Sequence, residues 1–174
     1  MSDFPVVQET KVLMASMNFL FNRNVIPYQF SVPRGKGIKT QDTINKISKL
    51  YDDYFQPAFL SSGPDIVAVS KNEWWYIECK GTGTGKKQTQ RNNFDRALAS
   101  VVSYFGEDRI DLSEKYKNAK QYLGLALPAS PIYIHELNRR VKIPLRKALN
   151  MWILLYEPET DSIRSIPSSH NIVK

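Results

Sequence analysis

The sequence is poor in the residues that form disulfides and soft-metal sites. It has one cysteine, Cys79, and two histidines among 174 residues. A single cysteine excludes an intramolecular disulfide framework and a cysteine-rich zinc module, and it indicates a reducing compartment. The histidines, His135 and His170, are isolated, so a histidine-based metal site or catalytic triad has little support.

Long apolar runs are also missing. No stretch approaches about 18 apolar residues, and the first residues lack the basic start and apolar stretch of a signal peptide. We therefore expect a soluble, cytoplasmic protein without a membrane partner.

Acidic residues are outnumbered by basic ones. The chain has 24 Lys and Arg against 17 Asp and Glu, a formal charge of +7 and a pI near 9.4. This balance favours an anionic partner, and nucleic acid is preferred because no basic amphipathic membrane helix is evident. The alternative is that the charge only keeps the protein soluble. At 20.0 kDa the chain fits one domain, so residues 1–174 are expected to form a single domain.

Apolar periodicity predicts alternating helices and strands. Predicted helices cover 9–21, an apolar stripe from Ile44 to Tyr54, a stripe from Gln90 to Phe105, 131–140 and 144–149. Predicted strands cover 28–32, 65–69, 74–80, 122–127 and 152–156. This order predicts an α/β or α+β fold with a central mixed β-sheet flanked by helices.

Two of these strands form a hairpin that gathers polar residues. The turn Ser70–Glu73 pairs residues whose numbers sum to 143 or 144, which places Asp65 opposite Glu78 or Cys79. Glu78 and Lys80 are two residues apart on one strand and share a face. We therefore expect Asp65, Glu78 and Lys80 to converge at one end of the hairpin.

Opposed carboxylates at the end of an apolar hairpin repel each other, and a bound cation would remove that cost. The expected ligands are the carboxylates of Asp65 and Glu78 and the backbone carbonyl of Cys79, whose sulfur should point away. These hard oxygens favour Mg²⁺ or Mn²⁺ over zinc. Such a site suits phosphodiester hydrolysis, with Lys80 orienting water or stabilising the phosphate.

The segment Gly63-Pro64-Asp65, followed after twelve residues by Glu78-Cys79-Lys80-Gly81, resembles the signature of the PD-(D/E)XK, or restriction-endonuclease-like, nuclease superfamily. The resemblance implies a restriction-endonuclease-like core and a Mg²⁺-dependent DNA endonuclease, in some cases working as a homodimer. It also implies a further acid on the leading helix, for which Glu9 is the candidate. Gln90 to Phe94 is similar to the Gln-X-X-X-Tyr motif of some branches, with Phe in place of Tyr.

Five basic residues and one glutamine near the motif are candidate contacts to the nucleic-acid backbone. They are Arg34, Lys36, Lys86, Lys87, Gln90 and Arg91. The loop Gly81–Gly85 is Gly/Thr-rich, but it lacks the Walker spacing, so a nucleotide-binding loop is rejected. A second basic segment, from Arg139 to Lys147, is interpreted as surface charge in preference to a phosphate track.

Two alternatives stay open. The motif could arise by chance, with Asp65 capping a turn and Glu78 and Lys80 forming an exposed pair. The fold could also serve a non-catalytic nucleic-acid-binding or assembly protein, or an RNA-cleaving relative. The three tryptophans, Trp74, Trp75 and Trp152, lie in apolar strands and are expected in the core or an interface.

Overall fold

A seven-stranded mixed sheet organises the chain. The structure, a computed structural model, describes residues 4–32, 40–51, 54–106, 116 and 118–172. The strand order is β2-β1-β3-β4-β5-β6-β7. The strands are β1 Ile26–Phe30, β2 Ala58–Phe59, β3 Ile66–Val69, β4 Glu73–Cys79, β5 Lys120–Pro128, β6 Met151–Glu157 and β7 Ser162–Ile166. The helices are α1 Glu9–Asn22, α2 Thr40–Tyr51, α3 Lys87–Ser103, α4 Pro131–Arg140 and α5 Ile143–Ala148.

The pairing pattern confirms a mixed sheet. β3 and β4 are antiparallel with Ile66 opposite Ile77, a register whose numbers sum to 143 as predicted. β4 and β5 are parallel, as are β5 and β6, and helices connect these parallel neighbours. β1 pairs antiparallel with β3 on one side of the centre, and β7 pairs antiparallel with β6 on the other.

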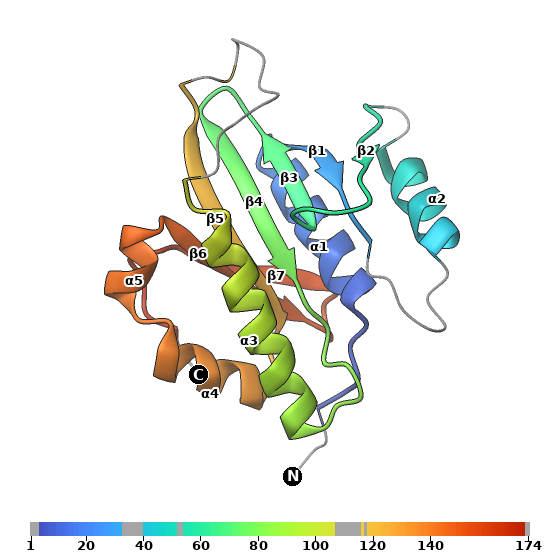
Figure 1. Cartoon of the computed structure of the whole chain (residues 1–174). Helices are drawn as coiled ribbons and strands as arrows, with labels where there is room; N and C mark the ends of the chain where they lie inside the picture. The colour runs from blue at the N-terminus through green and yellow to red at the C-terminus, as the bar shows by residue number, and fades with distance from the viewer. Residues whose placement is uncertain (1–3, 33–39, 52–53, 107–115, 117, 173–174) are drawn as a thin grey trace.

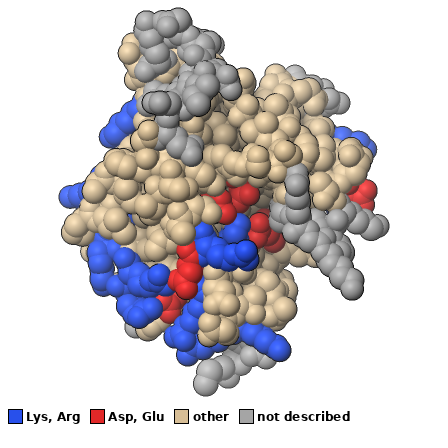
Figure 2. Space-filling view, in the orientation of Figure 1, with Lys and Arg blue, Asp and Glu red and all other residues tan. Residues whose placement is uncertain are grey.

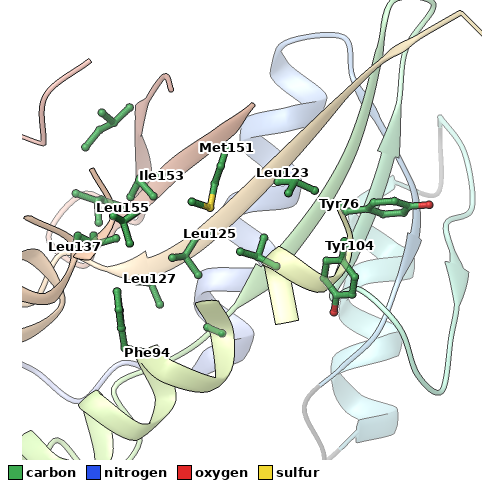
Figure 3. Close-up of a cluster of buried hydrophobic side chains, with 14 of the residues drawn as sticks. Tyr76, Phe94, Tyr104, Leu123, Leu125, Leu127, Leu137, Met151, Ile153 and Leu155 are labelled. Atoms are coloured by element: carbon green, nitrogen blue, oxygen red, sulfur yellow. The ribbon is translucent and has the colours of Figure 1, made fainter. Parts of the chain in front are cut away.

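Helices cover both faces of the sheet and create two apolar layers (Figure 1). Alternate residues of β4 supply them: Trp74 and Tyr76 face α3 and α4, while Trp75 and Ile77 face α1. Figure 3 shows the α3-side layer, in which the ring of Tyr104 lies 5.8 Å from that of Tyr76. The expected core positions of Trp74 and Trp75 are confirmed.

The ends of two predicted helices were wrong. Tyr54 and Phe105 were assigned to buried stripes, but they are 72% and 54% exposed and follow the last helical residues, Tyr51 and Ser103. After Ser103 the chain turns at Gly106, whose φ of 75° is left-handed. An apolar period in the sequence thus continues past the point where packing ends the helix.

Two edge strands were not predicted, and one strand starts earlier than expected. β2 is only two residues long, and β7 has alternating exposed and half-buried positions with weak apolar character. β1 begins at Ile26 and includes Pro27, which had been interpreted as a break. A bulge between Pro27 and Gln29 accommodates the proline.

Among the described residues, no helix is both long and apolar enough to cross a membrane.

Candidate active site

An open cleft of about 1100 Å³ is lined by residues of α1, α2 and α3 and by residues at the end of the β3–β4 hairpin. Asp65, Glu78, Lys80 and Glu9 all line it. Asp65 directly precedes β3, Glu78 is the penultimate residue of β4, and Lys80 follows β4. Glu9 is the first residue of α1. The hairpin therefore supplies three of these side chains, and a distant helix supplies the fourth.

Gly81 allows the start of α1 to approach the end of β4. A Cβ atom at this position would lie 2.4 Å from the carbonyl oxygen of Val7 and 2.6 Å from the amide nitrogen of Glu9, so only glycine fits without a shift of backbone. Two hydrogen bonds hold the approach: the Thr82 amide donates to the Val7 carbonyl at 2.9 Å, and the Val7 amide donates to Thr82 Oγ1 at 2.8 Å. This junction places Glu9 beside Lys80.

The Lys80 ammonium lies among four oxygen atoms. Its Nζ is 2.8 Å from Glu78 Oε1, 3.3 Å from Glu9 Oε1 and 3.7 Å from Asp65 Oδ2. It also donates a hydrogen bond of 2.8 Å to the Cys79 carbonyl. The side chains of Asp65, Glu78 and Lys80 are 12%, 9% and 18% exposed, so this is no exposed pair on the surface. The three residues expected to converge do so, and Glu9 joins them.

Uncharged hydrogen-bond donors hold the carboxylate groups of Glu78 and Asp65 in place. Tyr104 donates to Glu78 Oε2 at 2.9 Å, leaving Oε1 to face Lys80. Asp65 Oδ1 accepts from Ser31 Oγ at 3.2 Å, and its Oδ2 accepts from the Cys79 amide at 2.7 Å. Sequence reasoning missed Ser31 and Tyr104, because a single hydroxyl far from the motif carries no spacing signal.

Acidic side chains outnumber basic ones in the cluster around Lys80. Burial raises the pKa of Asp65 to about 7, against the opposing effect of Lys80, and burial also raises the pKa of Glu9. Burial by itself lowers the pKa of Lys80, but the charges of Asp65, Glu9 and Glu78 outweigh it and raise the pKa overall. One ammonium thus faces three carboxyl groups, and another cation would be stabilised here.

The chemistry of the donor set suits a hard divalent ion. Asp65, Glu78 and the Cys79 carbonyl present only oxygen atoms, and the Cys79 side chain is buried in the α1-side layer, away from the cleft as expected. In the part of the chain that is described, no group of three or more His, Cys, Asp or Glu side chains is arranged to hold a metal ion. The carboxylates are spaced around the Lys80 ammonium, so an incoming ion would compete with Lys80 for their oxygens.

Cations also line the walls of the cleft. Lys46 of α2 and Arg96 of α3 are lining residues, and neither forms an ion pair with a described carboxylate. Lys11 of α1 lies 3.8 Å from Asp161. Figure 2 shows blue basic side chains directly beside the red acidic ones in the middle of this face. Sequence reasoning missed these cations, since their positions on polar helix faces resemble any solvated charge.

The predicted backbone contacts occupy different environments. Arg34 and Lys36 lie outside the described residues. Lys86 and Lys87 are exposed at the start of α3. Arg91 lies on the α4 side of α3, where its Nε donates to Glu136 at 3.2 Å. Of the described residues in this group, Lys86, Lys87 and Arg91 are therefore not part of the cleft lining.

Gln90 and Arg146 are used inside the protein. Gln90 is 4% exposed, its amide nitrogen donates to the Gly85 carbonyl at 2.9 Å, and its oxygen accepts from Ser130 Oγ at 2.6 Å. Gln90 thus ties the loop after β4 to the start of α4. Arg146 is 1% exposed and donates to the carbonyls of Pro167 and His170, so the interpretation of Arg146 as surface charge was wrong.

No protein-family model matches the chain, and no significant match was found among curated proteins or solved structures.

Proposed function

We propose that the protein is a Mg²⁺- or Mn²⁺-dependent nuclease that hydrolyses phosphodiester bonds in DNA, built on a restriction-endonuclease-like core. One observation carries the proposal. Two motif carboxylates, a carbonyl oxygen and a third carboxylate surround the Lys80 ammonium at the base of an open cleft. Buried carboxyl groups with raised pKa values beside a specific charge partner in a cleft mark a candidate functional site.

Each residue of the site has a role in this proposal. Asp65, Glu78 and the Cys79 carbonyl would hold the ion, which when bound supplies an activated water and offsets the negative charge that develops on the phosphate. Lys80 would donate hydrogen bonds from Nζ to the water or to a phosphate oxygen, once a bound ion takes over some of the oxygen atoms that Nζ now contacts. Glu9, 3.3 Å from Nζ, orients the ammonium.

The walls of the cleft suit a phosphate backbone. Lys46 and Arg96 reach it from two different helices, α2 and α3, and among the described residues they have no carboxylate partner. Phosphates on either side of the reacting one would meet these cations. The net charge of +7 supports an anionic polymer as substrate.

A non-catalytic nucleic-acid-binding protein is the second candidate. The observation that favours it is that Lys80 already compensates the carboxylates through three contacts. Such a protein would bind nucleic acid with a strong salt dependence and would not cleave it.

Cleavage assays separate these candidates. Labelled duplex DNA, single-stranded DNA, branched DNA and RNA are incubated side by side with Mg²⁺, Mn²⁺ or EDTA. We expect a DNA substrate to be cut with either ion, no cleavage in EDTA, and no cleavage by Asp65→Asn or Glu78→Gln.

Glu157→Gln is the matched control, because Glu157, the last residue of β6, pairs with Arg164 of β7 at 2.8 Å and is not part of the cleft lining. It should cut like the parent. Binding without cleavage under every condition would favour the second candidate, and cleavage of RNA alone would change the substrate. Cleavage by Glu78→Gln at the parent rate would refute the site.

A further inference from the structure

α3 carries two different polar faces. Its residues Asn93, Arg96 and Ser100 line the cleft, whereas Gln88, Arg91 and Asp95 line a second, smaller pocket against α4. Offsets of three, four and seven place each set on one side of a helix. α3 therefore separates the candidate active site from this second pocket.

The second pocket has a volume of about 350 Å³ and a basic wall. It is lined by Gln88, Arg91, Asp95, His135, Glu136, Arg139 and Arg140. At its base is Glu136, which is 1% exposed and accepts hydrogen bonds from Arg91 Nε at 3.2 Å and from Arg139 Nη2 at 2.8 Å. A buried carboxylate thus fixes two guanidinium groups from different helices.

These two guanidinium groups keep most of their donors available. Arg91 uses only Nε and Arg139 only Nη2 in bonds to described residues, and their side chains are 41% and 61% exposed. The third arginine, Arg140, pairs with Asp95 and lies over the Phe94 ring at 5.1 Å. Three arginines share two carboxylates, so positive charge and planar donors remain in excess, which suits a phosphate group.

We infer that this pocket binds a backbone phosphate of the same nucleic acid whose reacting phosphodiester lies in the cleft, with Arg91 and Arg139 as the contacts and Glu136 as their positioning residue. The inference rests on the proposed function. Figure 2 shows Lys and Arg side chains close to acidic side chains on this face. Lys86, which precedes α3, and Lys87, its first residue, are exposed and add positive charge at the start of that helix.

α3 lies between the cleft and this pocket, so a nucleic acid that contacts both must cross this helix. A helix with its side chains is about 10–12 Å across, so the phosphate in the pocket is a different one from the phosphate in the cleft. A nucleic acid that ends before it reaches the α4 side of α3 would lose the contact.

Binding measured in EDTA, where no cleavage occurs, tests the pocket separately from catalysis. We expect Arg91→Ala and Arg139→Ala each to weaken DNA binding about five- to tenfold and to reduce the slope of log K against log salt by about one. Arg164→Ala is the control, since the Arg164 side chain is also 41% exposed and pairs with one carboxylate, Glu157. It should bind like the parent.

A scan with methylphosphonates, which neutralise one phosphate at a time, locates the contact. The parent should lose affinity when one particular phosphate outside the cleavage site is neutralised. Arg139→Ala should be insensitive to that replacement, because its contact is already lost.

The outcomes distinguish the two proposals. Cleavage of DNA with unchanged binding by both arginine variants would overturn the pocket and leave the nuclease intact. Absence of DNA binding by the parent would overturn both, even if inorganic phosphate alone bound to Arg91 and Arg139. Binding that depends on Arg139 without any cleavage would support the pocket and refute the nuclease.

Discussion

Replacement of Lys80 by methionine should make the stability of the folded protein depend on a divalent cation. The methionine keeps much of the length of the side chain but removes the ammonium that contacts Glu78, Glu9 and Asp65 at 2.8, 3.3 and 3.7 Å. The three carboxyl groups would then share one end of the cleft without their common counter-ion.

The magnitude follows from the burial of the cluster. Removing one partner of a buried ion pair costs about 3–5 kcal/mol, and since the Lys80 side chain is 18% exposed the lower value applies. In a domain of this size each kcal/mol changes Tm by about 2–4 °C, so Lys80→Met should melt roughly 6–12 °C below the parent in EDTA. Mg²⁺ at about 100 times its Kd should restore about 2.7 kcal/mol.

Thermal melts followed by circular dichroism, with EDTA or with Mg²⁺, measure both effects. Lys147→Met is the control, because Lys147 is an exposed residue of α5 away from the cleft lining. The double variant Lys80→Met/Asp65→Asn should recover stability in EDTA, since one carboxylate fewer repels the others. A destabilised Lys80→Met that Mg²⁺ and Mn²⁺ fail to stabilise would refute the reasoning that these oxygens take a divalent ion.

Three further predictions concern the same site. Burial raises the pKa of Asp65 from about 4 in the unfolded chain to about 7, so between these pH values the folded protein binds a proton that the unfolded chain does not. Protonation of Asp65 therefore stabilises the folded state fully below about pH 4, and this stabilisation is lost as the pH rises to about 7. Urea unfolding in EDTA should show this decline in the parent, and Asp65→Asn should lack that part of it. Gly81→Ala should lose about 1–3 kcal/mol in the same assay, because the new Cβ would meet the Val7 carbonyl at 2.4 Å; unchanged stability would contradict that close contact. Tyr104→Phe removes the hydrogen bond to Glu78 Oε2 and should weaken Mg²⁺ binding about tenfold in calorimetry, as expected for loss of an outer partner; an unchanged Kd would show that Tyr104 does not position Glu78.

Local patterns in the sequence are enough to predict the centre of the fold. The short turn between β3 and β4 sets the register, and the two-residue period of a strand then puts Glu78 and Lys80 on the face of Asp65. The strongly apolar strands β5 and β6 and the helices α4 and α5 were predicted from the same kind of short-range signal. The edge strands β2 and β7 were missed because they bury little apolar surface.

The sequence by itself determined that two carboxylates and a lysine meet at the end of a hairpin, since all three belong to one local unit. Only the tertiary structure decided what surrounds them. Glu9 arrives through the Gly81 junction, and Tyr104 reaches Glu78 from the far end of α3. Arg91 lies outside the cleft and Arg96 inside it because they occupy different faces of one helix. Such positions depend on how the helices pack onto the sheet. Contacts between residues far apart in the chain determine that packing, so no short stretch of sequence predicts it.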